Sequence, residues 1–126
     1  MPRQTSANLT DAELRLMDVL WEKGSATVSD VVDALDAKVP LAYSSVLTTL
    51  RVLERKGYLT HSKTGRAFVY RPVVGRGEAR QRALSHLLRR FFENSPELLM
   101  LNLIGDGKVN ADELARLKAR IEREKS

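Results

Sequence analysis

The sequence contains no cysteine. Disulfide bonds, thiolate metal sites and cysteine nucleophiles are therefore excluded together. Histidine is almost as scarce, since His61 and His86 lie far apart and neither has an acidic residue at the spacing of metal ligands. No pair of residues suggests a nucleophile beside a general base. We therefore expect no metal site, no cofactor and no catalytic residues, and the sequence does not predict an enzyme.

Long apolar runs are also missing. No run approaches the roughly 20 residues that a membrane-spanning helix needs. The first ten residues, MPRQTSANLT, lack the apolar segment of a signal peptide. We therefore expect a cytoplasmic protein without membrane insertion. The 126 residues, 43% apolar and 29% charged, indicate one globular domain, or one small domain with a helical extension.

Positive charge, in contrast, is present and unevenly distributed. Residues 41–72 hold six Lys or Arg and one acid, a net charge of +5 that equals the net charge of the whole chain. Residues 1–40 hold four basic and seven acidic groups, residues 73–90 five and one, and residues 91–126 six and seven. A helix followed by a basic hairpin can enter the DNA major groove and contact the flanking backbone. The middle third of the chain is thus the candidate DNA-binding region.

Capping and turn signals predict the elements of residues 1–74. Thr10 and Glu13 form a capping box that opens a first helix, and Thr27 opens a second one after a short connector or minimal strand at residues 25–27. A third helix over residues 42–56 ends at Gly57. Two β-rich runs around Thr64-Gly65 then predict a hairpin. The apolar residues expected to face inward on the first two helices are Leu14, Met17, Leu20, Trp21, Val28, Val31, Val32 and Leu35.

Three helices followed by a hairpin are typical of a winged helix-turn-helix domain, so the expected fold class is mainly α with a small β-hairpin. At about 100° per residue, the third helix places Val46, Leu50 and Leu53 on one side and a polar face on the other. We expect this face and the wing tip to bind DNA, through Tyr43, Ser44, Ser45, Thr48, Thr49, Arg51, Arg55, Lys63 and Arg66. We expect Arg55 to contact a backbone phosphate. Arg51 could contact either a base or a phosphate. Tyr43 either stacks on DNA or packs on the first helix.

Residues 75–126 form a second region, expected to be a helical dimerisation arm that begins after a hinge at residues 73–77. Its apolar stripes are too rich for short helices to bury alone. The residues expected to form the homodimer are Leu84, Leu87, Leu88, Phe91, Phe92, Leu99, Leu103, Leu114, Leu117 and Ile121. Residues 102–113 resemble a calcium loop, but Ile104 stands where a ligand oxygen is required, and Asn110 and Glu113 are better explained as a helix start.

The order of these motifs over residues 9–124 resembles the penicillinase-repressor family, the BlaI/MecI/CopY group of bacterial winged-helix repressors. The resemblance rests on LTxxE at residues 9–13, MDVLW at 17–21, AYSSVLTTLRVLERKG at 42–57 and GRAFVYRP at 65–72. It implies a homodimeric transcriptional repressor of double-stranded operator DNA, with dyads of TACA/TGTA type. β-Lactamase or related resistance and stress genes are the targets that it suggests.

The family has two inducer mechanisms. Copper-responsive members carry paired Cys-x-Cys motifs, so the absence of cysteine excludes copper sensing of that type. β-Lactam-responsive members are inactivated by a sensor-protease system that triggers cutting at an Asn-Phe bond in the dimerisation arm. The matching candidate cleavage site here is Asn102-Leu103, which departs from that pattern in its second residue.

Two other functions stay open at this point. One is a ligand-gated winged-helix regulator with a pocket between the C-terminal helices, lined by Phe91, Phe92 and Met100. The other is a winged-helix module that binds protein instead of nucleic acid. Protein binding and DNA binding can be distinguished by salt, because DNA affinity falls steeply as the salt concentration rises.

Overall fold

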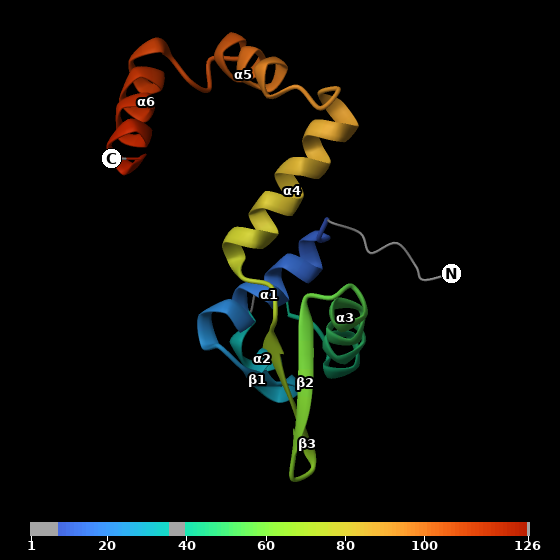
Figure 1. Cartoon of the computed structure of the whole chain (residues 1–126). Helices are drawn as coiled ribbons and strands as arrows, with labels where there is room; N and C mark the ends of the chain where they lie inside the picture. The colour runs from blue at the N-terminus through green and yellow to red at the C-terminus, as the bar shows by residue number, and fades with distance from the viewer. Residues whose placement is uncertain (1–7, 36–39, 126) are drawn as a thin grey trace. The chain divides into compact units, whose positions relative to one another are not determined.

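The computed structural model describes residues 8–35 and 40–125. The elements follow the chain as α1 (Asp11–Lys23), β1 (Ala26–Thr27), α2 (Val28–Ala34), α3 (Tyr43–Arg55), β2 (Leu59–Thr64), β3 (Ala67–Pro72), α4 (Arg76–Phe91), α5 (Pro96–Gly105) and α6 (Ala111–Lys125) (Figure 1). They form two compact units, Met1–Leu84 and Ser85–Ser126. The predicted fold class, mainly α with a small sheet in a winged helix-turn-helix arrangement, is confirmed.

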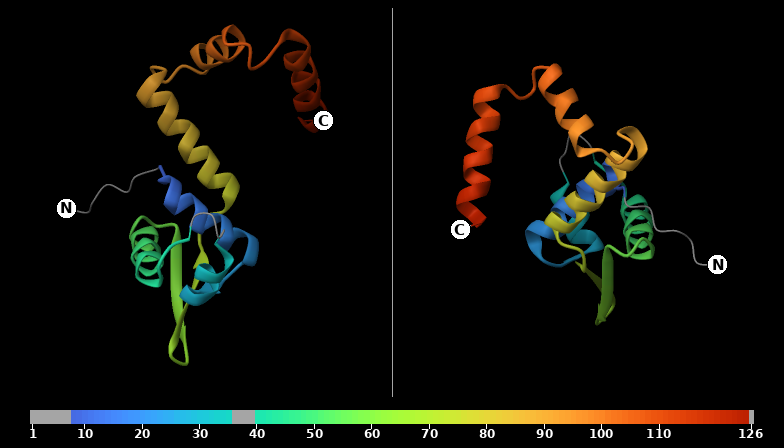
Figure 2. Two further views of the ribbon diagram at one scale, coloured as in Figure 1. Left: turned by 180° about the vertical axis from the view of Figure 1, so that it is seen from behind. Right: turned by 45° about the horizontal axis from the view of Figure 1, so that its top comes forward.

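A small antiparallel sheet completes the first unit. Its strand order is β1-β3-β2, so the minimal strand at Ala26–Thr27 pairs with β3 beside the hairpin. Thr64 pairs with Ala67, which leaves Gly65 and Arg66 as the two-residue turn. The turn predicted at Thr64-Gly65 was therefore one residue too early. Gly65 has φ +64°, which suits glycine at the first position of a two-residue hairpin loop. The hairpin tip projects beyond α1, α2 and α3 (Figures 1 and 2).

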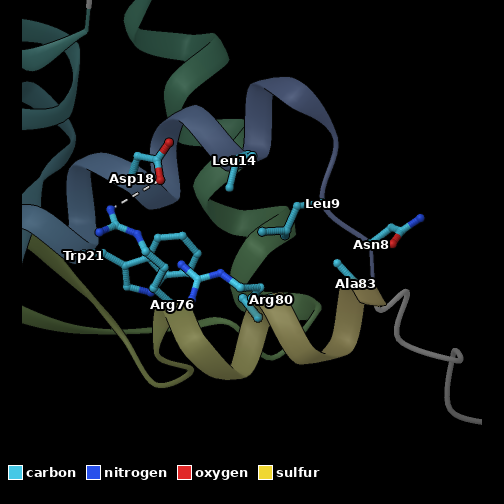
Figure 3. Close-up of a pocket in the computed structure, with 9 residues that line it drawn as sticks. Asn8, Leu9, Leu14, Asp18, Trp21, Arg76, Arg80 and Ala83 are labelled. Atoms are coloured by element: carbon cyan, nitrogen blue, oxygen red, sulfur yellow. Dashed lines mark hydrogen bonds and ion pairs between the residues drawn. The ribbon is translucent and has the colours of Figure 1, made fainter. Parts of the chain in front are cut away.

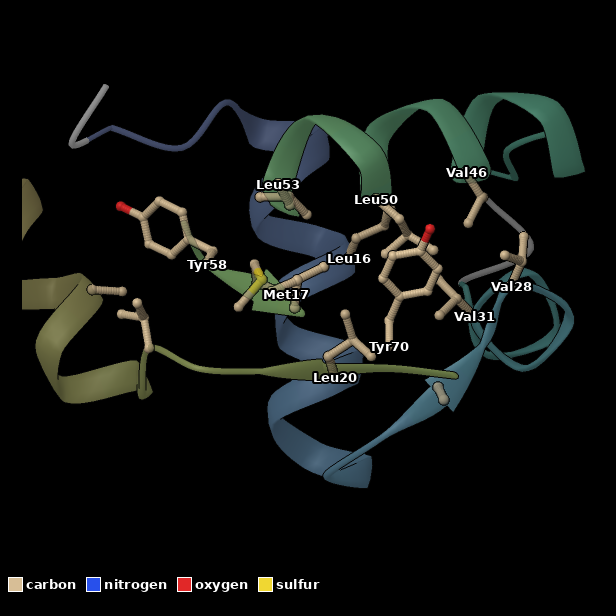
Figure 4. Close-up of a cluster of buried hydrophobic side chains, with 14 residues drawn as sticks. Leu16, Met17, Leu20, Val28, Val31, Val46, Leu50, Leu53, Tyr58 and Tyr70 are labelled. Carbon is tan, nitrogen blue, oxygen red and sulfur yellow. The ribbon is translucent and has the colours of Figure 1, made fainter. Parts of the chain in front are cut away.

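The core of the first unit joins the three helices to the sheet. Leu16, Met17 and Leu20 come from α1, and Val46, Leu50 and Leu53 from α3; all six are fully buried. Figure 4 shows these side chains in one cluster that extends from Tyr58 to Tyr70 of β3. The predicted α3 stripe is therefore confirmed. Leu14 was wrongly expected in the core: Leu16 is buried instead, and Leu14 is 42% exposed.

The end of α3 is fixed by its backbone. Gly57 has φ +89°, which glycine adopts without the steric strain of a side chain. The N–H of Tyr58 donates to the carbonyl of Leu53 at 2.9 Å, and the N–H of Gly57 donates to Glu54 at 3.0 Å. This pair of bonds is a Schellman motif, which satisfies the last carbonyls of the helix. It also turns the chain directly from α3 into β2, so the helix and the wing are joined by a short rigid link.

The second unit contains the end of α4 together with α5 and α6. Ser95 caps α5 and Pro96 occupies its first turn. Asn110 and Glu113 form the predicted helix start, because the Asn110 N–H donates to Glu113 Oε1 at 3.1 Å and the Glu113 N–H to Asn110 Oδ1 at 2.8 Å. The expected hinge is shorter than predicted, since Arg76 and Gly77 are already helical. The domain boundary predicted after residue 74 stays a prediction.

Candidate nucleic-acid interface

The polar face of α3 is open to solvent. Ser44, Ser45, Thr48, Arg51 and Arg55 are all exposed, opposite the buried stripe. The neighbouring Thr49 is only half-exposed, and its hydroxyl donates to the Ser45 carbonyl at 2.8 Å. This bond takes up the only proton of the Thr49 hydroxyl, so Thr49 can offer DNA only an acceptor or its methyl group.

A hollow of about 240 Å³ connects α3 with the wing and the start of α2. It brings together Tyr43, Arg51 and Arg66, three of the predicted DNA-binding residues. Tyr43 is 54% exposed, so the reading that buries it against the first helix is not supported. The lining also includes Ser29 and Phe68, which were not predicted as site residues. Phe68 could have been predicted from the sequence. It lies two residues before Tyr70 in the predicted strand, and side chains two residues apart point to the same face.

One face of the wing carries aromatic rings beside a cation. His61 lies opposite Tyr70 and Lys63 opposite Phe68 in the β2–β3 register. The His61 ring meets Phe68 edge-on at 5.2 Å between centroids and lies tilted against Tyr70 at 5.3 Å. Lys63 Nζ is 6.0 Å from the centre of the Phe68 ring. These contacts stiffen the hairpin, so its tip, with the exposed Lys63 and Arg66, is held out from the domain.

Arg51 is held at the junction of α3 and the wing. Burial, the largest cause, raises the pKa of the Tyr70 hydroxyl, and the Glu54 carboxylate acts in the same direction. A hydrogen bond from Arg51 and the charge of that guanidinium oppose the shift. Glu54 in turn contacts His61, with 2.7 Å between Oε1 and Nδ1. The Arg51 guanidinium thus acts on the Tyr70 hydroxyl of β3, whereas no ion pair holds the Arg55 side chain in the described part of the chain.

The predicted dimerisation residues leave much apolar surface in contact with solvent. Within α5 and α6, both fully described, no residue is buried. Phe91 is 69% exposed, Leu117 48% and Ile121 47%. Leu84 and Leu87 are also exposed, and the remaining predicted residues are half-buried: Leu88, Phe92, Leu99, Leu103 and Leu114. The second unit thus lacks a core of its own among these residues.

A hollow of about 580 Å³ lies within the second unit. It is lined by Phe92, Leu99, Leu101, Asn102, Leu103, Gly105, Asp106 and Lys108. Of the three residues expected to line a ligand pocket, Phe92 is part of the lining, whereas Phe91 and Met100 are not. The ligand-gated alternative stays a prediction. Among residues 8–35 and 40–125, no cluster of three metal-ligating side chains is found and no helix is long and apolar enough to cross a membrane.

The fold and this basic surface define a winged-helix DNA-binding protein. The sequence model of the penicillinase repressor family matches residues 9–123. The chain is 28% identical over 118 residues to the penicillinase repressor of Bacillus licheniformis, which covers 94% of this chain and 92% of that protein. It is 41% identical over 71 residues to the transcriptional regulator BlaI of Mycobacterium tuberculosis, covering 56% of this chain and 51% of that one.

A solved structure agrees with the sequence comparisons. The DNA-binding domain of the repressor BlaI is similar with a TM-score of 0.53 and 32% identity, over 60% of this chain and 93% of that domain. The chain belongs to the penicillinase repressor family. Its relatives are DNA-binding transcriptional repressors, so the expectation that it is not an enzyme is confirmed.

Proposed function

We propose that the chain represses transcription in the cytoplasm as a homodimer bound to a palindromic operator. The observation that carries the proposal is the continuous surface formed by the polar face of α3 and the β2–β3 wing. A helix with small hydroxyl side chains can approach base edges in the major groove, and flanking guanidiniums reach phosphates. The TACA/TGTA dyad implied by the family is the operator to test first.

Each part of this surface has a separate role in the proposal. Ser44, Ser45 and Thr48 face the base edges, and Tyr43 stacks on sugars or thymine methyl groups. Arg51, which lines the hollow between α3 and the wing, reaches the bases or the phosphate next to them. The phosphate contacts come from Arg55 at the end of the helix and from Lys63 and Arg66 at the wing tip.

Dimerisation is proposed because the second unit leaves apolar side chains exposed. Phe91 on α4 and Leu117 and Ile121 on α6 are all exposed, and large exposed apolar surface on a soluble protein marks an interaction site. A two-fold dimer presents two identical DNA-binding domains, and half-sites about 34 Å apart or a multiple of that match its symmetry. We therefore assign residues 1–74 to operator binding and residues 75–126 to dimerisation.

Inactivation by cleavage between Asn102 and Leu103 is part of the same proposal. The carbonyl of Asn102 accepts the N–H of Asp106 at 2.9 Å, and the Asn102 side chain donates to the Leu98 carbonyl at 3.0 Å. A protease needs extended backbone, so α5 must open locally before this bond can be cut.

The test is a salt-dependent titration of a palindromic TACA/TGTA duplex. Contact with about six to ten phosphates gives a log–log slope of affinity against salt near −5 to −9. The quadruple variant Ser44→Ala/Thr48→Ala/Arg51→Ala/Arg55→Ala should lose this binding while keeping the wild-type circular dichroism spectrum. Equal affinities for variant and wild type would move the DNA site elsewhere. A slope near zero would favour the protein-binding alternative.

A further inference from the structure

A second hollow, of about 330 Å³, lies in the first unit between α1 and the first turns of α4. It is lined by Asn8, Leu9, Leu14, Asp18, Trp21, Arg76, Ala79, Arg80 and Ala83. The polar face of α3 and the wing contribute nothing to this lining, so the hollow is separate from the proposed DNA surface. Figure 3 shows Leu9 and Leu14 pointing from the α1 side toward α4.

The floor of this hollow is apolar and its rim is charged. Leu14, the residue wrongly expected in the core, is 42% exposed here, where it can contact a ligand. The Trp21 indole is held in place by a hydrogen bond from Nε1 to the Val74 carbonyl at 2.9 Å. Ligand sites in proteins commonly combine such a preformed apolar surface with a few polar groups.

The rim carries more positive than negative charge. Arg76 lies 5.2 Å from the centre of the Trp21 ring and pairs with Asp18 at 3.4 Å, a long contact between two half-exposed side chains. Arg80 has no ion-pair partner among residues 8–35 and 40–125. Two guanidiniums thus face one carboxylate, and the charge that is left uncompensated is that of Arg80.

We infer that this hollow is a binding site for a small monocarboxylate with an aromatic or branched apolar body. The apolar part occupies the space between Leu14, Trp21 and Ala83, and the carboxylate pairs with Arg80. The volume is at the lower end of the roughly 300–1,000 Å³ of small-molecule sites, which limits the ligand to one or two rings. One carboxylate is favoured over two, because Asp18 already neutralises Arg76.

The single tryptophan makes the test direct. Trp21 is the only tryptophan of the chain, so one indole N–H cross-peak in a proton–nitrogen correlation spectrum reports on this site. Full-length protein is titrated with phenylacetate, with the neutral phenylacetamide and with the cationic phenethylamine. A fragment of this size should bind with a Kd on the order of 1 mM. The acid should bind about five- to tenfold more tightly than the amide, and the amine least, because a charge-assisted hydrogen bond is stronger than a neutral one.

Two variants and one control locate the contact. Arg80→Gln should weaken phenylacetate binding about five- to tenfold, to the level of the amide. Arg89→Gln makes the same charge change further along α4, outside the lining, and should leave the affinity within about twofold, since only nearby charges contribute much. Ala83→Phe fills the hollow and should abolish the response, with the circular dichroism spectrum checking that the fold is kept.

Four results would overturn the inference. One is an indole signal that shows no saturable change with phenylacetate, and another is an equal response to acid and amide. A third is an equal loss of affinity in Arg80→Gln and Arg89→Gln. The last is an indole signal that moves with protein concentration alone, which would mean that a second copy of the chain covers the hollow.

Discussion

Glu13 on α1 and Lys56 at the end of α3 form an ion pair, with 2.7 Å between Oε1 and Nζ. The Glu13 side chain is 8% exposed, and the same oxygen accepts the N–H of Thr10 at 2.9 Å as part of the α1 capping box. The lysine therefore links the start of α1 to the end of the proposed recognition helix. Although Lys56 lies in the basic middle third of the chain, its charge is used inside the domain.

Substitution of the two neighbouring cations, Lys56 and Arg55, should therefore affect different properties. Lys56→Met keeps the aliphatic stem but leaves the Glu13 carboxylate without its partner, so the free energy of unfolding should fall by about 1–3 kcal/mol. Arg55→Met, on the exposed face, should change stability by no more than about 0.5 kcal/mol. It should weaken specific and non-specific DNA binding alike and reduce the salt slope by about one. Urea unfolding and operator titration of both variants provide the measurement. A stable Lys56→Met variant would show that the pair does not contribute.

The charge pattern alone could not distinguish these two cations. Glu13 and Lys56 are 43 residues apart, and only the packing of α1 on α3 brings them together. Local signals did predict the capping boxes, the α3 stripe and the end of α3 at Gly57, because these depend on near neighbours. Leu14 and Leu16 both fit an apolar helix face, and the choice between them depends on where α4 and the sheet pack.

For the DNA-binding surface, too, the sequence predicted the contribution of the α3 helix but not that of residues from other elements. The helical period separated Thr48 and Arg55 from the core, since burial on α3 repeats with the helix turn. Ser29 lies on another element, and its place beside Arg51 and Arg66 follows from the tertiary fold. The same holds for the effect of the Arg51 guanidinium on the pKa of the Tyr70 hydroxyl.

Sequence preference should depend on the helix, not on the wing. Thr48→Ala should narrow the affinity difference between matched and mismatched operators by about 1–3 kcal/mol, the value of one good base contact. The double variant Lys63→Gln/Arg66→Gln removes only phosphate contacts, so it should weaken all duplexes equally. Competition binding against single-base operator variants measures both. If the wing variant alters the order of preference among duplexes, the wing reads bases.

Stability near the start of α2 should depend on pH through Asp30. A hydrogen bond from the Thr27 N–H, the largest cause, lowers the pKa of the Asp30 carboxyl, and the Thr27 side chain and the charge of Lys23 act in the same direction. Because the folded-state pKa lies below the unfolded-state value, the ionised group stabilises the fold above the unfolded-state pKa. This contribution disappears as the pH falls through the folded-state pKa.

The variant that tests this is Asp30→Ala. Its melting temperature should lie below that of the wild type at neutral pH, and the gap should close in acid. Asp33→Ala on the same helix is the control for removing an aspartate that does not take part in the α2 capping box. A gap for Asp30→Ala that stays constant from neutral to acidic pH would assign the loss to helix propensity instead of the capping carboxylate.

Dimerisation should fail when the α4 stripe is truncated. Leu87→Ala/Phe91→Ala removes two large apolar side chains, and each change of this kind costs about 2–5 kcal/mol where the residue is buried in an interface core. The dissociation constant of the dimer should therefore rise by several orders of magnitude, as measured by sedimentation equilibrium. Arg89→Ala on the same helix is the control. A wild-type protein that sediments as a monomer at micromolar concentration would contradict the proposed dimer.

Truncation after Asn102 tests whether the second unit controls operator binding. The core around Leu16, Leu50 and Tyr70 lies entirely in the first unit, so the truncated chain should keep a folded winged-helix domain. It loses α6 and the end of α5, and with them four of the ten residues proposed to form the dimer: Leu103, Leu114, Leu117 and Ile121. Two linked domains bind a dyad far more tightly than one, because the second contact is intramolecular, and the loss can reach about 10²- to 10⁴-fold.

The measurement for the truncated chain is paired. Circular dichroism reports the fold, and titrations of a full dyad and of a single half-site report the affinity. The half-site affinity should match that of the full chain, since the α3 surface is intact, whereas the dyad affinity should fall to the half-site level. Dyad binding as tight as that of the full chain would show that the second unit is not the switch, and cleavage at Asn102-Leu103 would then have no means of releasing the operator.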